Sequence, residues 1–218
     1  MRGMTVIELA FTISIVGLMM FFALKGKDVI EGMRSVAVMY EMEQYQRLIV
    51  GYQDTYDELP GDDPRSPNRW NRPSALTVVT ETVTASLAGN SKLDGKLYEV
   101  GNPGGEQFAA WRDLRFSGAL EGDPKFEGTS ALPENPFGGF YGLDEGNLGQ
   151  KEGSLCATRI PGRAAQRIDA KMDDGRINSG KVVATSKFSI EDRHHFPAPD
   201  TEPYNIEKEY IICIPMMP

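Results

Sequence analysis

An apolar stretch near the N-terminus constrains this chain more than any other feature. Residues 4–24 read MTVIELAFTISIVGLMMFFAL, and their only ionisable side chain is that of Glu8. Such a stretch, wound as a helix that rises about 1.5 Å per residue, reaches about 31 Å, the thickness of a bilayer's hydrocarbon core. We therefore predict a transmembrane helix over residues 4–24.

Two simpler interpretations explain this stretch less well. A secretory signal peptide has a longer basic start and a small-residue cleavage site, whereas only Arg2 precedes the stretch and residues 22–25, FALK, follow it. A generic signal anchor explains the apolar length but not Glu8. A carboxylate within a membrane costs about 2.5 to 3.5 kcal/mol on insertion scales and indicates a functional site. We expect its partner to be a cation from another chain.

The residues around Glu8 carry a resemblance to a known family. Gly3 followed by MTVIEL at residues 4–9 resembles the processing site of type IV pilins and type II secretion pseudopilins. In that family a membrane peptidase cleaves after the glycine, the new amine is methylated, and the acid at the fifth mature position neutralises that amine on a neighbouring subunit. The resemblance implies a leader peptide of residues 1–3, cleavage between Gly3 and Met4, methylation of Met4 and a role in assembly for Glu8.

Further motifs extend the resemblance over nearly the whole chain. YDELPGD at residues 56–62 with Trp70 downstream, EQFAAWRDL at 106–114 and IDAKMDDG at 168–175 are similar to stretches of many bacterial pilin-like proteins of this size. The chain departs from the family at residues 25–26, Lys-Gly, where many members have a proline. This departure argues against a proline kink after the apolar stretch.

The helical pattern continues beyond the apolar stretch. Apolar residues recur at steps of four and three, which places them on one stripe of a helix: they are Val38, Met42, Tyr45, Ile49, Tyr52, Tyr56 and Leu59. Leu59-Pro60-Gly61 ends the pattern, because proline forbids a continued helix. We predict one helix over residues 4–58, with this stripe packed against a globular head. The polar neighbours Glu41, Glu43, Gln44, Gln46 and Arg47 are predicted to face elsewhere.

Residues 59–218 are predicted to form one periplasmic or extracellular head domain. Apolar spacing and flanking glycine or proline indicate short helices at residues 106–114 and 161–172, the second capped by Gly175. β-Branched runs at residues 155–160, 181–189 and 206–214 indicate strands. A run at residues 76–87 fits a helix or a strand. The predicted fold class is α+β, pilin-like: a long N-terminal helix packed on a small antiparallel-sheet head.

The chain has two cysteines, Cys156 and Cys213. With an export-type N-terminus, such a pair indicates one disulfide, whose loop stabilises a fold by roughly 4 kcal/mol in the chain-entropy model. The alternative is two reduced cysteines in the core, where free cysteine is common. In the family that this chain resembles, a disulfide commonly holds the C-terminal segment. We therefore predict a C-terminal disulfide loop.

One group of residues could hold a metal ion. Asp169, Asp173, Asp174 and Asn178 offer oxygen ligands, which suit calcium, and some pseudopilins carry calcium in C-terminal loops. Their spacing does not fit the twelve-residue calcium loop, and Asp-Asp-Gly is equally a helix end followed by a turn. We favour the turn and keep calcium as a hypothesis. No other cofactor is expected. His194 and His195, being adjacent, are interpreted as residues of a solvated loop.

Composition and motifs favour a structural role. A formal net charge of -8 argues against nucleic-acid binding. The chain has no phosphate-binding loop, nucleophile elbow or metalloprotease helix, so we expect no enzymatic activity. An anchored enzyme is the least favoured interpretation.

The resemblance implies a structural subunit of a type IV pilus or type II secretion filament. Its partners would be prepilin peptidase, an inner-membrane assembly platform and other pilins. The resemblance also implies a single-pass inner-membrane precursor with its head in the periplasm, and later a periplasmic or extracellular filament. The alternative is a membrane-tethered periplasmic binding or adhesive protein that does not polymerise.

Overall fold

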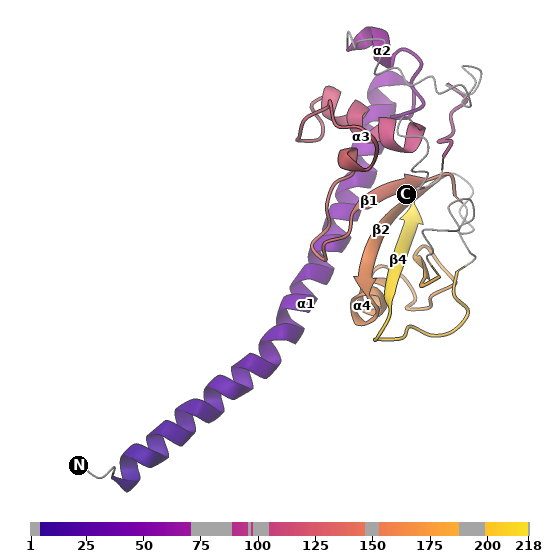
Figure 1. The fold of residues 1–218 in the computed structure, drawn as a ribbon. Helices are drawn as coiled ribbons and strands as arrows, with labels where there is room; N and C mark the ends of the chain where they lie inside the picture. The colour runs from indigo at the N-terminus through magenta and orange to yellow at the C-terminus, as the bar shows by residue number, and fades with distance from the viewer. Residues whose placement is uncertain are drawn as a thin grey trace.

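The structure is a computed structural model that describes residues 5–70, 89–95, 97, 105–146, 153–187 and 199–217. A long N-terminal helix runs along the head and extends well beyond it at the N-terminal end (Figure 1). The elements are α1 (Val6–Tyr56), α2 (Ser66–Arg69), α3 (Glu106–Phe116), the 3-10 helix η2 (Gly128–Ala131), β1 (Tyr141–Asp144), β2 (Ser154–Pro161), α4 (Gly162–Met172), β3 (Val183–Thr185) and β4 (Glu209–Pro215).

Helix α1 is a single helix of 51 residues, which confirms the predicted long N-terminal helix. Thr5 is its N-cap and forms a capping box with Glu8. At the other end, Asp57 adopts a left-handed conformation with φ of 57°, and its N–H donates to the carbonyl of Gln53 at 2.8 Å. The helix therefore ends just before Pro60, as the sequence predicts. Residues 1–3, the predicted leader, and Met4 lie outside the described residues.

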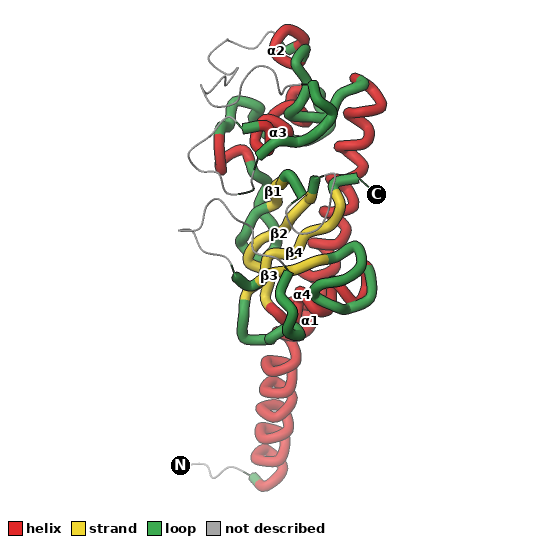
Figure 2. Tube along the Cα trace, turned by 90° about the vertical axis from the view of Figure 1, so that its right-hand side faces the viewer, coloured by secondary structure: helices red, strands yellow, loops and turns green. Residues whose placement is uncertain are grey.

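The head is built on a four-stranded sheet in the order β1-β2-β4-β3, and all its pairs are antiparallel. Figure 2 shows this sheet beside α1, with α4 near the lower end of the head. Strand β2 contains the predicted strand at 155–160. Strand β4 begins at Glu209, later than predicted, because Lys208 donates to the carbonyl of Asn205 in a turn. The fold is thus α+β, with an antiparallel sheet.

The other predicted elements have mixed outcomes. Helices α3 and α4 confirm the predicted helices at 106–114 and 161–172. Strand β3 is shorter than the predicted 181–189, because Asp200 binds the N–H and hydroxyl of Ser186 just after the strand. Residues 188–189, the run at 76–87 and the two adjacent histidines lie outside the described residues. Strand β1 was not predicted.

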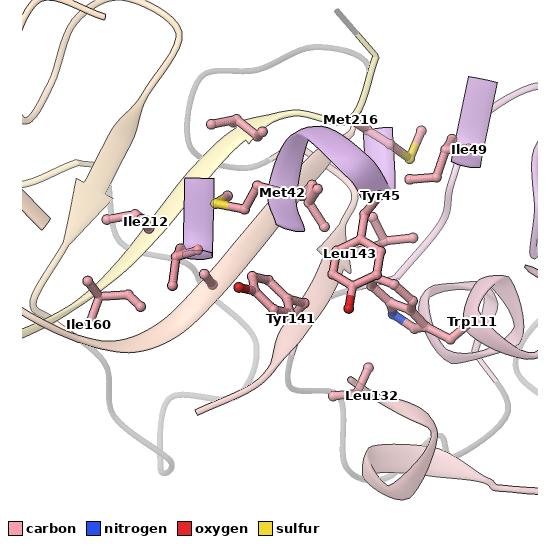
Figure 3. Packing of buried hydrophobic residues seen from close by; sticks show 14 of the residues in the cluster. Met42, Tyr45, Ile49, Trp111, Leu132, Tyr141, Leu143, Ile160, Ile212 and Met216 are labelled. Atoms are coloured by element: carbon pink, nitrogen blue, oxygen red, sulfur yellow. The ribbon is translucent and has the colours of Figure 1, made fainter. Parts of the chain in front are cut away.

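The predicted stripe of α1 forms the centre of the core (Figure 3). The ring of Tyr45 packs edge-on against Trp111 of α3 and Tyr141 of β1, with ring centroids 5.1 and 5.0 Å apart. Two of the polar neighbours do not face away from the head, contrary to the prediction. Glu41 accepts a hydrogen bond from the Tyr141 hydroxyl at 2.6 Å, and the Gln46 side chain donates to the carbonyl of Pro215 at 2.7 Å.

The turn after α1 is fastened to α3. The N–H of Gly61 and the hydroxyl of Ser66 both donate to the carboxylate of Asp113, at 2.9 and 2.6 Å. Asp63 accepts a hydrogen bond from the Tyr52 hydroxyl at 2.9 Å and pairs with Arg69 at 3.0 Å. The two motifs YDELPGD and EQFAAWRDL therefore form one contact.

We predict that Gly61→Ala destabilises the head by more than about 1 kcal/mol, because a side chain is strained at left-handed φ and its Cβ would have no room. Gly61 has φ of +91°, and a Cβ there would clash with the Glu106 carbonyl and lie 2.9 Å from the Ala110 nitrogen. The measurement is urea denaturation of the detergent-solubilised protein.

Gly51→Ala is the matched control for this experiment. Gly51 lies on α1 with open space around its Cα, so its replacement is expected to be neutral or slightly stabilising. Equal unfolding free energies for the two variants would contradict the close approach of the turn to α3.

Candidate functional site

The N-terminal half of α1 has the length and composition of a membrane span. Among the described residues, α1 is the one helix with a window apolar enough to cross a membrane, with a mean hydropathy of 2.2. None of that window is buried within the protein. The apolar part that the sequence assigns to a membrane thus lies outside the core of the head.

Glu8 lies at the start of this span, on the first turn of α1. Both the N–H and the hydroxyl of Thr5 donate to Oε2 of Glu8, each at 2.8 Å, and the Glu8 N–H donates to Thr5 Oγ1 at 3.4 Å. The carboxylate therefore caps the helix within its own chain, a role that the sequence analysis missed. The signal was present, since Thr and Glu three residues apart are the pattern of a capping box.

The resemblance assigns two other residues to the same region. Gly3 and Met4, the predicted cleavage and methylation residues, lie outside the described residues. Among the described residues of α1, the first cationic side chain after Glu8 is that of Lys25. No charge from the described part of the chain therefore lies near enough in sequence on this helix to neutralise Glu8.

A second apolar stripe on α1 lies beyond the predicted span. Val29, Met33, Val36 and Tyr40 are each between 47% and 64% exposed. They recur at steps of four, three and four, so they share one face of the helix. Because Val36 and Val38 are two positions apart, about 200° around the axis, this face points away from the head-packing stripe. The sequence analysis recorded only the buried stripe, although the same periodicity marks both.

The two cysteines are joined as predicted. Cys156 and Cys213 form a disulfide across a sequence separation of 57 residues. They are directly paired residues of β2 and β4, and both are buried. The alternative of two reduced cysteines is therefore wrong. The bond holds the C-terminal strand to the centre of the sheet.

The acidic residues proposed for calcium come together at the end of α4. Asp169, Asp173 and Asp174 each offer an oxygen within 4.8 Å of the others. Asp169 is buried, Asp173 is half-buried, and Asp174 is exposed. Asn178, the fourth predicted ligand, is exposed on the turn that follows. The sequence thus identified three carboxylates that do share one place.

Hydrogen bonds within the chain engage all three carboxylates. Asp169 accepts from the Tyr204 hydroxyl at 2.7 Å and from the Gly175 N–H at 3.1 Å. The other two accept from donors of the turn that follows α4: Asp173 from the Lys181 and Val182 N–H groups, and Asp174 from the Arg176 N–H and the Ser179 hydroxyl. These bonds support the favoured interpretation as a turn. Burial, together with the charges of Asp174 and Asp173, raises the pKa of Asp169 to about 6.

A second acidic group, which the sequence analysis missed, lies where the turn after α1 meets α3. Asp62 accepts hydrogen bonds from the N–H groups of residues 89–91, and Glu106 accepts one from the Asp94 N–H at 2.7 Å. Burial, assisted by the charges of Asp62 and Asp94, raises the pKa of Glu106 to about 8. Glu106 is therefore largely protonated at neutral pH. Asp62, Asp94 and Glu106 are far apart in sequence, so no sequence motif predicts that they lie close together.

Comparisons of the chain with protein-family models, with curated proteins and with solved structures found no match. The resemblance to pilins therefore stays a prediction. The functional interpretation depends on α1, its two stripes and Glu8.

The calcium hypothesis predicts that millimolar calcium raises the melting temperature at pH 7, above the raised pKa of Asp169, and has no effect near pH 4.5. At the lower pH Asp169, whose pKa is about 6, is protonated and attracts a cation less. Asp174→Asn keeps the side-chain oxygen but removes a charge and should abolish the rise, whereas Asp123→Asn on a distant loop should not. Unchanged melting curves would leave the carboxylates as turn residues only.

We predict that the head loses stability as pH rises from 5 to 9, because folding favours protonated Glu106. A pKa raised to about 8 gives stability that is present below the ordinary value near 4.5 and is lost as pH passes about 8. Glu106→Gln keeps an acceptor for the Asp94 N–H and should reduce the fall in melting temperature by at least about 3 °C. Exposed Glu121→Gln is the control, and three parallel melting profiles would refute this assignment.

Proposed function

We propose that this chain is a structural subunit of a type IV pilus or type II secretion pseudopilus filament. It would be held in the inner membrane by α1 with its head in the periplasm, cleaved between Gly3 and Met4 by prepilin peptidase, and methylated on Met4. An inner-membrane assembly platform would then polymerise it with other pilins into a periplasmic or extracellular filament. The observation that carries the proposal is the exposed stripe of Val29, Met33, Val36 and Tyr40.

The length of α1 makes this stripe informative. From Val6 to Tyr40 the helix rises about 52 Å, roughly 20 Å more than the hydrocarbon core of a bilayer. The charged residues Lys25, Lys27 and Asp28 separate the apolar span from the stripe. The stripe therefore stands in water when the N-terminal part of α1 crosses a membrane.

Apolar side chains in water favour a protein partner. Full burial of a Val or Met side chain contributes about 1.5 to 3 kcal/mol, so covering the stripe provides a substantial driving force. The stripe lies opposite the head-packing face of α1, with Val36 and Tyr40 at the edge of a groove beside the head. A rod-shaped helix is best covered by other helices lying alongside it. A filament core made of α1 helices supplies that cover, both for the stripe and for the apolar span once it leaves the membrane.

Glu8 supports the same proposal through its charge. In a filament core of low dielectric its carboxylate needs a cation, and the resemblance assigns that cation to the N-terminal amine of a neighbouring subunit. Such pairing would set the axial register between subunits. In the proposed filament, the exposed stripe would hold neighbouring subunits together, and Glu8 would set the axial register between them.

We predict that Met33→Glu reaches the membrane at normal levels but is depleted from sheared filaments at least about tenfold, because it places a charge in the contact between helices. Met33 is 64% exposed, so the fold of the isolated subunit should be unaffected. The measurement is quantitative mass spectrometry of filaments and membranes from the native host, which also reports cleavage after Gly3. Thr201→Glu adds the same charge at an exposed position of the head outside α1 and should assemble normally.

Glu8→Gln, carried through the same assay, separates capping from pairing. Glutamine at this position preserves the capping box but has no charge to pair with an amine. Cleaved but unassembled protein would therefore place the requirement on the charge. Normal incorporation of both Met33→Glu and Glu8→Gln would contradict the filament proposal and favour a membrane-tethered binding protein that does not polymerise.

A further inference from the structure

An apolar groove of about 520 Å³ opens beside the exposed stripe, between α1, the end of α4 and the end of β4. Met39 and Tyr40 of α1 line one side, and Met172, Val182 and Pro215 of the head line the other. This volume lies in the range of ordinary ligand pockets and is ample for one aromatic side chain. The groove can therefore receive a protruding apolar side chain from a partner.

The rim of the groove carries two lysines, which lie beside the acidic end of α4. Lys171 and Lys181 line it from the head, and both residues are exposed. The carboxylate of Glu43, also at the rim, is paired with Arg47 on the same helix at 3.7 Å. The neighbouring Asp173 and Asp174 do not line the groove. A partner that fits this groove would thus combine an apolar side chain with negative charge.

The loop between α3 and η2 has that combination. Phe126 is 47% exposed, whereas Leu120, the other large apolar side chain of this loop, packs against the core. Three exposed acids flank it in sequence, Glu121, Asp123 and Glu127, against one lysine, Lys125. Asp123 also interacts electrostatically with Arg115 of α3, and Glu127 with Arg112, which leaves Glu121 as the acid without such a neighbour in the part of the chain that the structure describes. The carboxylate of Asp123 accepts the N–H of Lys125 at 2.9 Å, and its carbonyl accepts the N–H of Phe126 at 3.3 Å. The loop is thus a structured turn that presents an aromatic ring among acids.

We propose that Phe126 of one copy inserts into this groove on a second copy, with Glu121 and Asp123 facing Lys171 and Lys181. This inference rests on the proposed function, because it names the contact between heads in the filament. It joins complementary shapes and complementary charges, which together fix orientation.

The placement of the two surfaces suits an open filament. Helix α3, from which the Phe126 loop leaves, lies toward the end of the head farthest from the N-terminus, and α4 lies nearer the N-terminal end (Figure 1). A contact between two different surfaces is heterologous, and repeating it builds a helical filament when the rotation does not close. Val36 and Tyr40 belong both to the groove and to the exposed stripe, so the proposed contact lies next to the helix packing of the filament core.

Cysteine cross-linking in filaments tests the contact directly. The native cysteines are bonded to each other, so introduced thiols have no native partner. A chain carrying both Phe126→Cys and Met172→Cys should form a ladder of covalent multimers, and neither single variant should. Absence of the ladder in filaments that assemble normally would overturn the contact. A ladder from Met33→Cys with Met172→Cys in its place would assign the groove to a second copy's α1 and would also overturn it.

Charge reversal provides an independent measurement with its own rescue. Lys171→Glu with Lys181→Glu should lower filament yield at least about tenfold, since like charges would then face each other. Adding Glu121→Lys and Asp123→Lys to the same chain should restore the yield to within about twofold of wild type. Unchanged melting of each variant shows that the head still folds. Filaments that tolerate both reversals would overturn the contact alone, whereas a wild-type chain that never assembles would overturn the proposed function.

Discussion

The structure depends on one helix that presents two opposite apolar faces. One face, centred on Met42 and Tyr45, is covered by the chain's own sheet and α3. The opposite face, at Met33 and Val36, is left exposed. Because a solvated helix face usually carries polar residues, this second face is the feature from which we infer a partner. Continuity of α1 between the apolar span and the head is essential, because a break would decouple head orientation from the packing of the span.

The head keeps its position on α1 through a contact between distant motifs. Asp113 of α3 binds both Gly61 and Ser66, which are separated from it by 52 and 47 residues. The turn after α1 is thereby locked to the helix that carries Trp111, and Trp111 packs on Tyr45 of α1. Helix α1, the turn after it and α3 are therefore each in contact with the other two. The disulfide separately holds β4 to β2 at the centre of the sheet.

Local patterns in the sequence predicted what local physics determines. The 3.6-residue period gave α1, α3 and α4, and β-branched runs gave the three later strands. Strand β1 was missed because Tyr141–Asp144 is short and contains glycine and aspartate, which are rare in strands. The hydrogen bond from Tyr141 to Glu41 and the raised pKa of Glu106 come from residues distant in sequence, which periodicity cannot bring together. The acids near Asp169 were found because they lie within one short segment.

The geometry of Glu8 is compatible with both the observed cap and the proposed pairing between subunits. Both donors of Thr5 bind the same oxygen, Oε2. The other oxygen, Oε1, receives no hydrogen bond from the described residues, so capping does not use the full capacity of the group. An amine from a neighbouring subunit could therefore bind Oε1 without breaking the cap. In that arrangement the cap would hold the side chain in one orientation beforehand, which lowers the entropy lost on pairing and makes the axial register more sharply defined.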